Sequence, residues 1–330
     1  MLAASAVTMT AQSPAPPRTE ITNGVLKVLV YLPDAANGFF KGTRFDWAGV
    51  IGQLDYQNHV FYAPWFTRLD PAQRDYTATD SEVLAGPNTA ITGPVEEFQQ
   101  PLGYDEAPAG GSFVKIGVGR LRKPEAGGAY SAFRLYDIVD PGTRTLETRS
   151  DAITFTHELR DPAGYAYQYT KMLRLTAGQP EMRLEHRLRN TGSRRIETTV
   201  YNHNFLTIDG RPTGAGFVVK TPYDIVPARP PDPTLATVAG REVRYVGTLT
   251  GRQVVSTPLG GFGSTPADYD FRIEHTGAGV GVHIVGDRAP SNVTLWSMRT
   301  TIGLEPFIGI GIDPGAEFTW TLTYTYYTLK

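Results

Sequence analysis

A strict two-residue alternation near the C-terminus is the feature that most restricts how this chain can fold. Aromatic and aliphatic residues from Phe318 to Tyr326 alternate with threonines. Successive side chains of an extended strand point to opposite faces, so this period is typical of a half-buried β-strand and does not fit a helix. Met182–Arg189 shows the same alternation, with apolar residues and His186 on one face and charged residues on the other.

Turn residues separate many similar short segments. Asn190–Ser193 is predicted to be a turn, and Arg195–Phe205 is the strand that returns from it. Helical periodicity is poor throughout, whereas 35 glycines and 25 prolines can supply frequent turns. We therefore predict an all-β fold, a large antiparallel β-sandwich. The other predicted strands are Val25–Tyr31, Val50–Tyr56, His59–Phe61, Phe113–Gly119, Ala152–Leu159, Tyr167–Leu175, Val243–Thr248, Phe271–His275, Val280–Gly286 and Asn292–Arg299.

The domain organisation follows from the same pattern. Residues 21–330 are predicted to form a single β-sandwich domain, interrupted by long loops at Arg211–Thr237 and Thr257–Asp270. Residues 1–20 are small and weakly apolar and then proline-rich, which predicts either a disordered tail or the remnant of a signal peptide. A remnant would place the protein in the periplasm or outside the cell, and a plain tail in the cytoplasm. No later segment approaches the ~18 apolar residues that cross a bilayer, so no membrane partner is predicted.

Charge and cysteine content exclude several classes of function. The formal net charge is -2, which leaves no basic excess for a phosphate backbone, so nucleic acid is not an expected partner. The chain has no cysteine, which rules out disulfides, thiolate metal sites and a cysteine nucleophile. Its six histidines show no ligand-like spacing, so neither a metal nor a cofactor is predicted. The sequence does not indicate an oligomeric state.

The first candidate functional segment is an aromatic–histidine–aromatic strand face. Tyr201, His203 and Phe205 share one face of the predicted strand, and Asn202 and Asn204 share the other. Such a face suits a sugar, because the sugar's C–H groups stack on aromatic rings and its hydroxyls form hydrogen bonds. The alternative is a buried histidine bonded to a backbone carbonyl.

The second candidate is Glu305, a single carboxylate within the apolar run Ile302–Ile308. Glutamate is almost never fully buried without a partner, and burial raises the pKa of a carboxyl toward the range that a general base needs. Pro306 is expected to end ladder pairing there, as at a sheet edge or a bulge. The alternative is a glutamate that reaches solvent at a sheet edge.

Around these two segments the sequence resembles the galactose mutarotase-like superfamily, which contains the aldose 1-epimerases. Asn202–Leu206 looks like a shortened form of the family strand that carries the general-acid histidine. Leu304–Glu305 is similar to the Leu-Glu pair that carries the family's base, and Pro314–Glu317 is similar to the turn after it. The alternating strand Phe318–Tyr326 follows in the same order, and Tyr169–Asn190 resembles the strands that precede the histidine strand.

The resemblance implies a galactose mutarotase-like sandwich and an aldose 1-epimerase-like enzyme acting on a small sugar or oligosaccharide. His203 would be its acid and Glu305 its base. Arg44 stands roughly where the family places a substrate-binding arginine. The family's second histidine, in a His-Gly-Gly motif, is missing, and Gly86–Gly119 is instead rich in charged and aromatic residues. The predicted substrate-binding residues are Arg44, Trp47, Glu97, Lys115, Tyr201, Asn202 and Phe205, with structural ion pairs as the alternative for the charged ones.

Three other functions remain open at this point. The same His203–Glu305 pair could abstract a proton beside a carboxylate, as a carbohydrate lyase does, with Lys115 or Arg44 neutralising the enolate. A glycoside hydrolase would need two carboxylates on opposite sides of a cleft, and Glu97 and Glu305 are the candidate pair for that role. The third is a non-catalytic carbohydrate-binding sandwich. The catalytic hypotheses predict that His203 and Glu305 lie on neighbouring strands and line one pocket, with room for a sugar ring between them.

Overall fold

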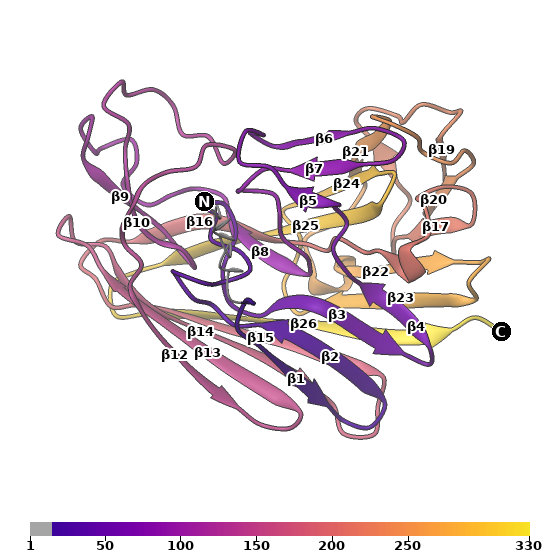
Figure 1. The fold of residues 1–330 in the computed structure, drawn as a ribbon, viewed down its shortest axis with the longest axis horizontal. Helices are drawn as coiled ribbons and strands as arrows, with labels where there is room; N and C mark the ends of the chain where they lie inside the picture. Colours follow the sequence, from indigo (N-terminus) through magenta and orange to yellow (C-terminus); the bar gives the residue numbers. More distant parts are fainter. Residues whose placement is uncertain (1–14) are drawn as a thin grey trace, which may run out of the picture.

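The computed structural model describes residues 15–330, and nearly all of its regular structure is β-strand (Figure 1). The described residues contain only two short 3-10 helices, η1 (Ile208–Gly210) and η2 (Pro266–Asp268). The predicted all-β class is therefore confirmed. Most of the predicted N-terminal tail lies outside the described residues, but Arg18–Thr22, at its end, forms a strand.

The largest sheet has ten strands, all paired antiparallel to their neighbours. The C-terminal alternating segment lies near its centre, where Trp320, Tyr324 and Tyr326 are buried and the intervening threonines are not. The strands in spatial order are β12 (Thr143–Thr148), β13 (Ala152–Arg160), β14 (Ala166–Leu175), β15 (Glu181–Asn190), β26 (Glu317–Thr328), β23 (Val280–Gly286), β22 (Asp270–His275), β17 (Phe217–Lys220), β20 (Glu242–Tyr245) and β19 (Ala236–Ala239).

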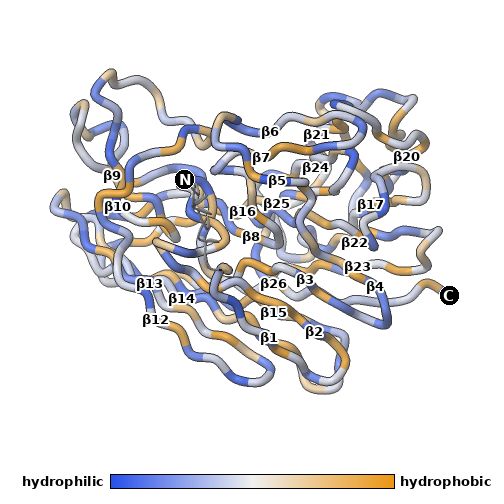
Figure 2. The backbone as a smooth tube through the Cα atoms, in the orientation of Figure 1, coloured by the Kyte–Doolittle hydropathy of each residue, from blue (hydrophilic) through white to orange (hydrophobic). Residues whose placement is uncertain are grey.

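A six-stranded antiparallel sheet forms the second layer. Val200 and Ile308 from its inner face join the same apolar cluster as Leu184 and Leu322 of the ten-stranded sheet, and this cluster is the main core. Figure 2 shows hydrophobic residues following the strands of the interior while many outer loops are hydrophilic. The order in this sheet is β18 (Val226–Pro227), β21 (Val254–Gly260), β24 (Asn292–Met298), β25 (Thr301–Ile312), β16 (Ile196–His203) and β8 (Val95–Phe98).

Smaller elements complete the fold. Ile21, Val28 and Leu54 of the N-terminal strands join the main core, whereas Phe45 and Trp65 pack with Phe205 in a second apolar cluster on the outer face of the six-stranded sheet. Three small sheets are formed by β1 (Arg18–Thr22), β2 (Leu26–Tyr31), β3 (Val50–Tyr56) and β4 (His59–Tyr62); by β5 (Arg68–Leu69), β7 (Val83–Ala85) and β6 (Tyr76–Ala78); and by β11 (Ile138–Asp140), β10 (Gly119–Arg122) and β9 (Ser112–Lys115).

Three local predictions need correction. Phe113–Gly119 is not one strand but the hairpin of β9 and β10, because the chain reverses at Gly117, whose φ is +79°. The predicted loop Arg211–Thr237 contains β17, β18 and part of β19, and Thr257–Asp270 begins inside β21. Pro227 is accommodated because β18 is an edge strand, where a missing backbone N–H is tolerated.

The expectation for Pro306 is half right. β25 is an interior strand that pairs with β24 from Thr301 to Phe307, so Pro306 marks no edge. On the other side, however, pairing with β16 stops at Tyr201–Phe307 and returns only as the bridge between Leu206 and Ile302. Even-numbered residues of β25 direct their backbone groups toward β16, as the Ile302–Leu206 hydrogen bonds show, so Pro306 removes a donor on that side. The ladder is therefore open for several residues in the middle of the sheet.

Candidate active site

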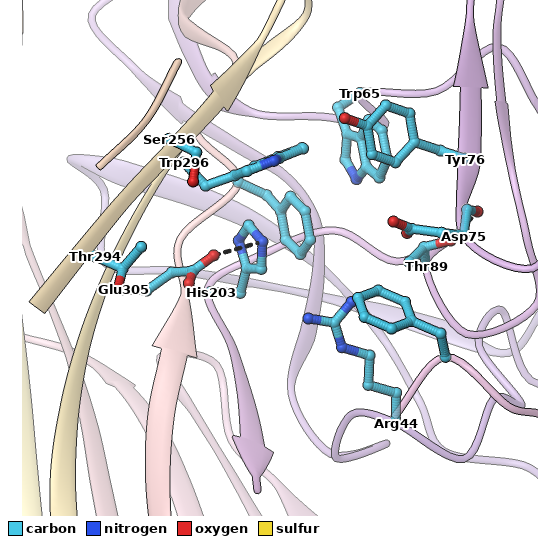
Figure 3. A pocket seen from close by; sticks show the side chains of 12 residues that line it. Arg44, Trp65, Asp75, Tyr76, Thr89, His203, Ser256, Thr294, Trp296 and Glu305 are labelled. Atoms are coloured by element: carbon cyan, nitrogen blue, oxygen red, sulfur yellow. Dashed lines mark hydrogen bonds and ion pairs between the residues drawn. The ribbon is translucent and has the colours of Figure 1, made fainter. Parts of the chain in front are cut away.

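A cavity of about 200 Å³ opens on the outer face of the six-stranded sheet, at the gap in the ladder (Figure 3). One wall comes from the sheet itself, and the opposite wall comes from loops and short strands of the first half of the chain. The lining residues are Arg44, Trp65, Asp75, Tyr76, Thr89, Phe133, His203, Phe205, Ser256, Thr294, Trp296 and Glu305.

His203 and Glu305 meet directly on the sheet wall. The β16–β25 register places them opposite each other, and His203 Nε2 lies 3.0 Å from Glu305 Oε1. Their side chains are only 5% and 12% exposed, and both line the cavity. This contact corrects the expectation of a sugar ring between them: the pair stands side by side and presents one edge to the cavity.

Packing holds the His203 imidazole in place. Phe205 stacks on one face of it, with ring centroids 3.5 Å apart and planes 3° from parallel. The backbone of Phe205 has φ +36°, a strained left-handed conformation for a residue with a side chain, and Trp65 stacks beyond it at 5.4 Å. Gly303 of β25 makes room for the imidazole, because a Cβ there would come within 2.5 Å of His203 Cε1.

The two ring nitrogens of His203 have different surroundings. Nε2 faces the Glu305 carboxylate at 3.0 Å. His203 Nδ1 is buried and has no hydrogen-bond partner among residues 15–330. In contrast to many metal-ligating or triad histidines, this ring is oriented by stacking and by one carboxylate, without a second polar partner.

Arg44 borders the cavity below the pair, as Figure 3 shows. Its Nε donates to Glu97 Oε2 at 2.6 Å and its Nη2 donates to the Tyr201 hydroxyl at 3.0 Å. Phe45 and Phe133 flank the guanidinium, with centroids 4.5 and 4.6 Å from Cζ. Burial alone would lower the pKa of Arg44, but Glu97 and Tyr201 outweigh it and the net pKa is raised, so the side chain is a fixed cation.

Glu97 and Lys115 lie behind Arg44 and do not line the cavity. Burial would raise the pKa of Glu97, but Arg44 and Lys115 more than offset it and the pKa is lowered. Lys115 is fully buried, donates to the Phe98 carbonyl and lies 3.8 Å from Glu97 Oε1; burial lowers its pKa to about 8. The two residues match the structural ion-pair alternative, and the proposed hydrolase pair of Glu97 and Glu305 does not share one cavity.

Trp47 and Asn202, both predicted to bind substrate, point elsewhere. The Trp47 indole donates to the Gly42 carbonyl at 2.8 Å, and its ring packs under the Arg144 guanidinium. Asn202 lies on the inner face of β16, because successive strand residues face opposite sides, and it donates to Glu96 Oε1 at 2.9 Å. Tyr201 stays on the outer face but acts on the cavity only through Arg44 and Glu97.

Asn202 belongs to a second, fully buried charge cluster between the sheets. Lys171 donates to Glu96 and lies 3.9 Å from Asp46, and His186 Nε2 lies 2.9 Å from Glu96 Oε1. Burial would raise the pKa of Glu96, yet Lys171 and His186 lower it to about 2. Asp46 competes for the same lysine less successfully, so burial raises its pKa to about 6.

The opposite wall contains the residues that sequence reasoning missed. Asp75 and Tyr76 face the His203–Glu305 pair across the cavity in Figure 3, and burial raises the pKa of Asp75 against the opposing effect of Arg44 and His203. Asp75 stands in an irregular segment and Tyr76 begins the three-residue strand β6, which is too short for a periodic signal. Trp296 was more accessible to prediction, because it lies on a predicted strand and pairs in register with Gly303.

The described residues show neither a membrane-spanning helix nor a ready metal site. No helix within residues 15–330 is long and apolar enough to cross a bilayer. Over the same residues, no group of three or more His, Asp or Glu side chains is arranged to hold a metal ion.

Comparison of sequences finds no matching family model and no matching curated protein. Solved structures do match. A protein from Synechocystis is similar with a TM-score of 0.57 and 12% identity, over 98% of this chain and 100% of that one. A putative aldose 1-epimerase from Escherichia coli K12 is similar with a TM-score of 0.52 and 13% identity, over 94% of this chain and 99% of that one.

A homologue of galactose mutarotase and aldose epimerase from Caenorhabditis elegans is also similar, with a TM-score of 0.51 and 11% identity over 96% of this chain and all of that chain. At these identities the comparisons establish the fold. The chain has the galactose mutarotase-like fold, as its sequence motifs imply.

Proposed function

We propose that this protein is an aldose 1-epimerase-like enzyme that interconverts the anomers of a sugar, with Glu305 as base and His203 as acid. One observation carries the proposal: among residues 15–330, His203 and Glu305 form an ion-pair contact on the cavity wall, with His203 Nε2 3.0 Å from Glu305 Oε1. The fold, shared with structures named as aldose 1-epimerases and their homologues, supports the same class of substrate.

The chemistry fits a side-by-side pair. Glu305 removes the proton from the anomeric hydroxyl, and His203 gives a proton to the ring oxygen as the bond from that oxygen to the anomeric carbon breaks. The anomeric carbon gains a carbonyl, rotation exposes its other face, and the reverse transfers close the ring as the other anomer. Both oxygens are attached to the same carbon, so an acid and a base on one wall reach them together.

The rest of the cavity serves a single sugar ring. Trp296 and Tyr76, both only partly buried, offer aromatic surface for its C–H faces, while Asp75, Thr294 and Arg44 offer hydrogen bonds to its hydroxyls. Arg44 is already neutralised by Glu97, so it adds little net positive charge to stabilise an enolate. This arrangement favours anomer exchange over the lyase alternative, which depends on such a cation.

The test is anomer exchange measured by NMR on a panel of aldoses and uronates, with a parallel scan for unsaturated products. Glu305→Gln keeps shape and hydrogen bonding but removes the basic carboxylate, so turnover should fall by roughly 10²–10⁴-fold with little change in affinity. His203→Asn should lower turnover similarly, and the double variant should lose less than the product of the two losses, because acid and base act as one unit.

Two results would contradict the proposal. Wild-type turnover by Glu305→Gln on an identified substrate would remove Glu305 as the base. Sugar binding without anomer exchange on any aldose or uronate would instead favour the non-catalytic carbohydrate-binding sandwich.

A further inference from the structure

A second hollow of about 360 Å³ lies next to the sugar-sized cavity beside His203, and Phe133 lines both. Two chain segments also pass from one to the other: Arg74 lines the second hollow and Asp75 the first, and Asn88 lines the second and Thr89 the first. The two hollows are therefore neighbours with Phe133 as a common wall, and together they are longer than one sugar ring needs.

The second hollow presents an apolar platform on a braced loop. Phe133 and Leu135 are 37% and 54% exposed, which is unusual for large apolar side chains beside a cavity. The buried Asn88 holds the loop in place, since it accepts from the Thr43 backbone N–H at 2.7 Å and donates to the Ala132 carbonyl at 3.2 Å. An exposed aromatic ring on a fixed loop is a stacking surface for a sugar.

Charge distinguishes this hollow from the first. Arg74 and Arg134 both line it, and neither forms an ion pair with a carboxylate anywhere in residues 15–330. Arg74 donates only to the Ser131 hydroxyl, at 2.9 Å, which leaves further donors available. In the first cavity, by contrast, Arg44 is paired with Glu97, and Asp75 and Glu305 are acidic. Of the two neighbouring hollows, the second is therefore the one with positive charge that no carboxylate of the described chain neutralises.

We propose that this hollow is a second subsite, and that the substrate is an acidic oligosaccharide. Its reacting unit occupies the cavity at His203 and Glu305, while the neighbouring unit stacks on Phe133 and directs an anionic group, a carboxylate or a sulfate ester, to Arg74 and Arg134. The assignment of the reacting unit rests on the proposed function, whereas the recognition of the acidic unit rests on the second hollow alone.

The experiment titrates the full chain with four reducing sugars: a monosaccharide, a neutral disaccharide, and the same disaccharide with a uronate or a sulfated non-reducing unit. Calorimetry gives the affinity, and tryptophan fluorescence reports the first cavity, which Trp65 and Trp296 line. The acidic disaccharides should bind roughly 10–100-fold more tightly than the neutral one, as hydrogen bonds to charged groups predict. The better of the two acidic sugars identifies the anionic group.

Variants locate the effect. In the double variant Arg74→Gln/Arg134→Gln, the ratio of the affinities for acidic and neutral disaccharide should fall to about one. In the wild-type protein, raised salt should lower the same ratio. Phe133→Ala should weaken both disaccharides. Arg160→Gln, at an exposed arginine on β13 in the other sheet, is the matched control and should keep the preference.

The outcomes separate the two proposals. Tight binding of an acidic disaccharide without anomer exchange supports the subsite and refutes the proposed reaction. Anomer exchange on the monosaccharide, with disaccharides bound no better, supports the reaction and overturns the subsite. Retention of the acidic preference by the double arginine variant also overturns the subsite.

Discussion

Gly303 is the position where a single methyl group should disable the candidate acid without touching it chemically. A Cβ at this position would lie 2.5 Å from His203 Cε1 and 2.8 Å from Nδ1. Carbon atoms in ordinary contact stand about 3.5–4.0 Å apart, so in Gly303→Ala the imidazole must shift by about 1 Å or more. Phe205 stacks on the ring at 3.5 Å, so the displacement separates Nε2 from Glu305.

The expected cost follows from that shift. A misplacement of about 1 Å at a reacting group lowers turnover by roughly 10²-fold, whereas the overpacking itself costs about 1–3 kcal/mol of folding free energy. NMR anomer exchange measures the first quantity and urea unfolding the second. Gly309→Ala is the matched control, because Gly309 lies on the same strand and the same face and a Cβ there meets nothing within 4 Å.

Two results would refute this reasoning. The first is a folded Gly303→Ala protein with wild-type turnover, which would show that the His203–Glu305 contact is not needed. The second is an equal loss of turnover in Gly309→Ala, which would show that any added bulk on β25 is harmful. The imidazole signals of His203 in the NMR spectrum give an independent measure, since they should shift in Gly303→Ala alone.

The buried cluster between the sheets gives two further predictions. Lys171→Met leaves Glu96 without its main partner and should lower the free energy of unfolding in urea by about 3–5 kcal/mol. Lys27→Met breaks an exposed ion pair and should lower it by at most about 1 kcal/mol. Equal losses in the two variants would argue against a stabilising role for the buried cluster. The pKa of Asp46 is about 6 in the folded protein, above its ordinary value of 3.8, so the folded state binds this proton more tightly and stability should fall as pH rises from about 4 to 6. Asp46→Asn should remove that part of the pH dependence, and an unchanged slope in the variant would contradict the assignment.

The sequence predicts the parts of this molecule that are locally periodic. The alternation of Phe318–Tyr326 reflects a strand with one buried face, and the fold places it near the centre of the largest sheet. His203 and Glu305 were found for a related reason, since each is a titratable residue in an apolar or aromatic strand. Period two also put Asn202 on the face opposite His203, so its selection as a substrate-binding residue conflicted with the pattern itself.

The other residues that line the cavity could not be predicted from the local sequence pattern. Asp75 and Phe133 come from irregular segments whose position depends on distant contacts, such as the hydrogen bonds of Asn88. Trp47 and Lys115 are an aromatic and a charged residue, as a binding site would contain, yet both are buried and their nitrogen atoms donate to backbone carbonyls in the interior. Charged and aromatic residues near one another in sequence therefore indicate a polar interior as readily as a binding surface.

The opening in the β16–β25 ladder has a mechanical consequence. Between Tyr201 and Leu206 the two strands share no ladder pairing, and the Asn204 side chain, which donates to the Leu304 carbonyl, spans the space instead. His203 and Glu305 thus lie on strands that are braced from opposite sides, β16 by β8 and β25 by β24. A small change in the spacing of these two side chains would therefore break no ladder hydrogen bond between β16 and β25.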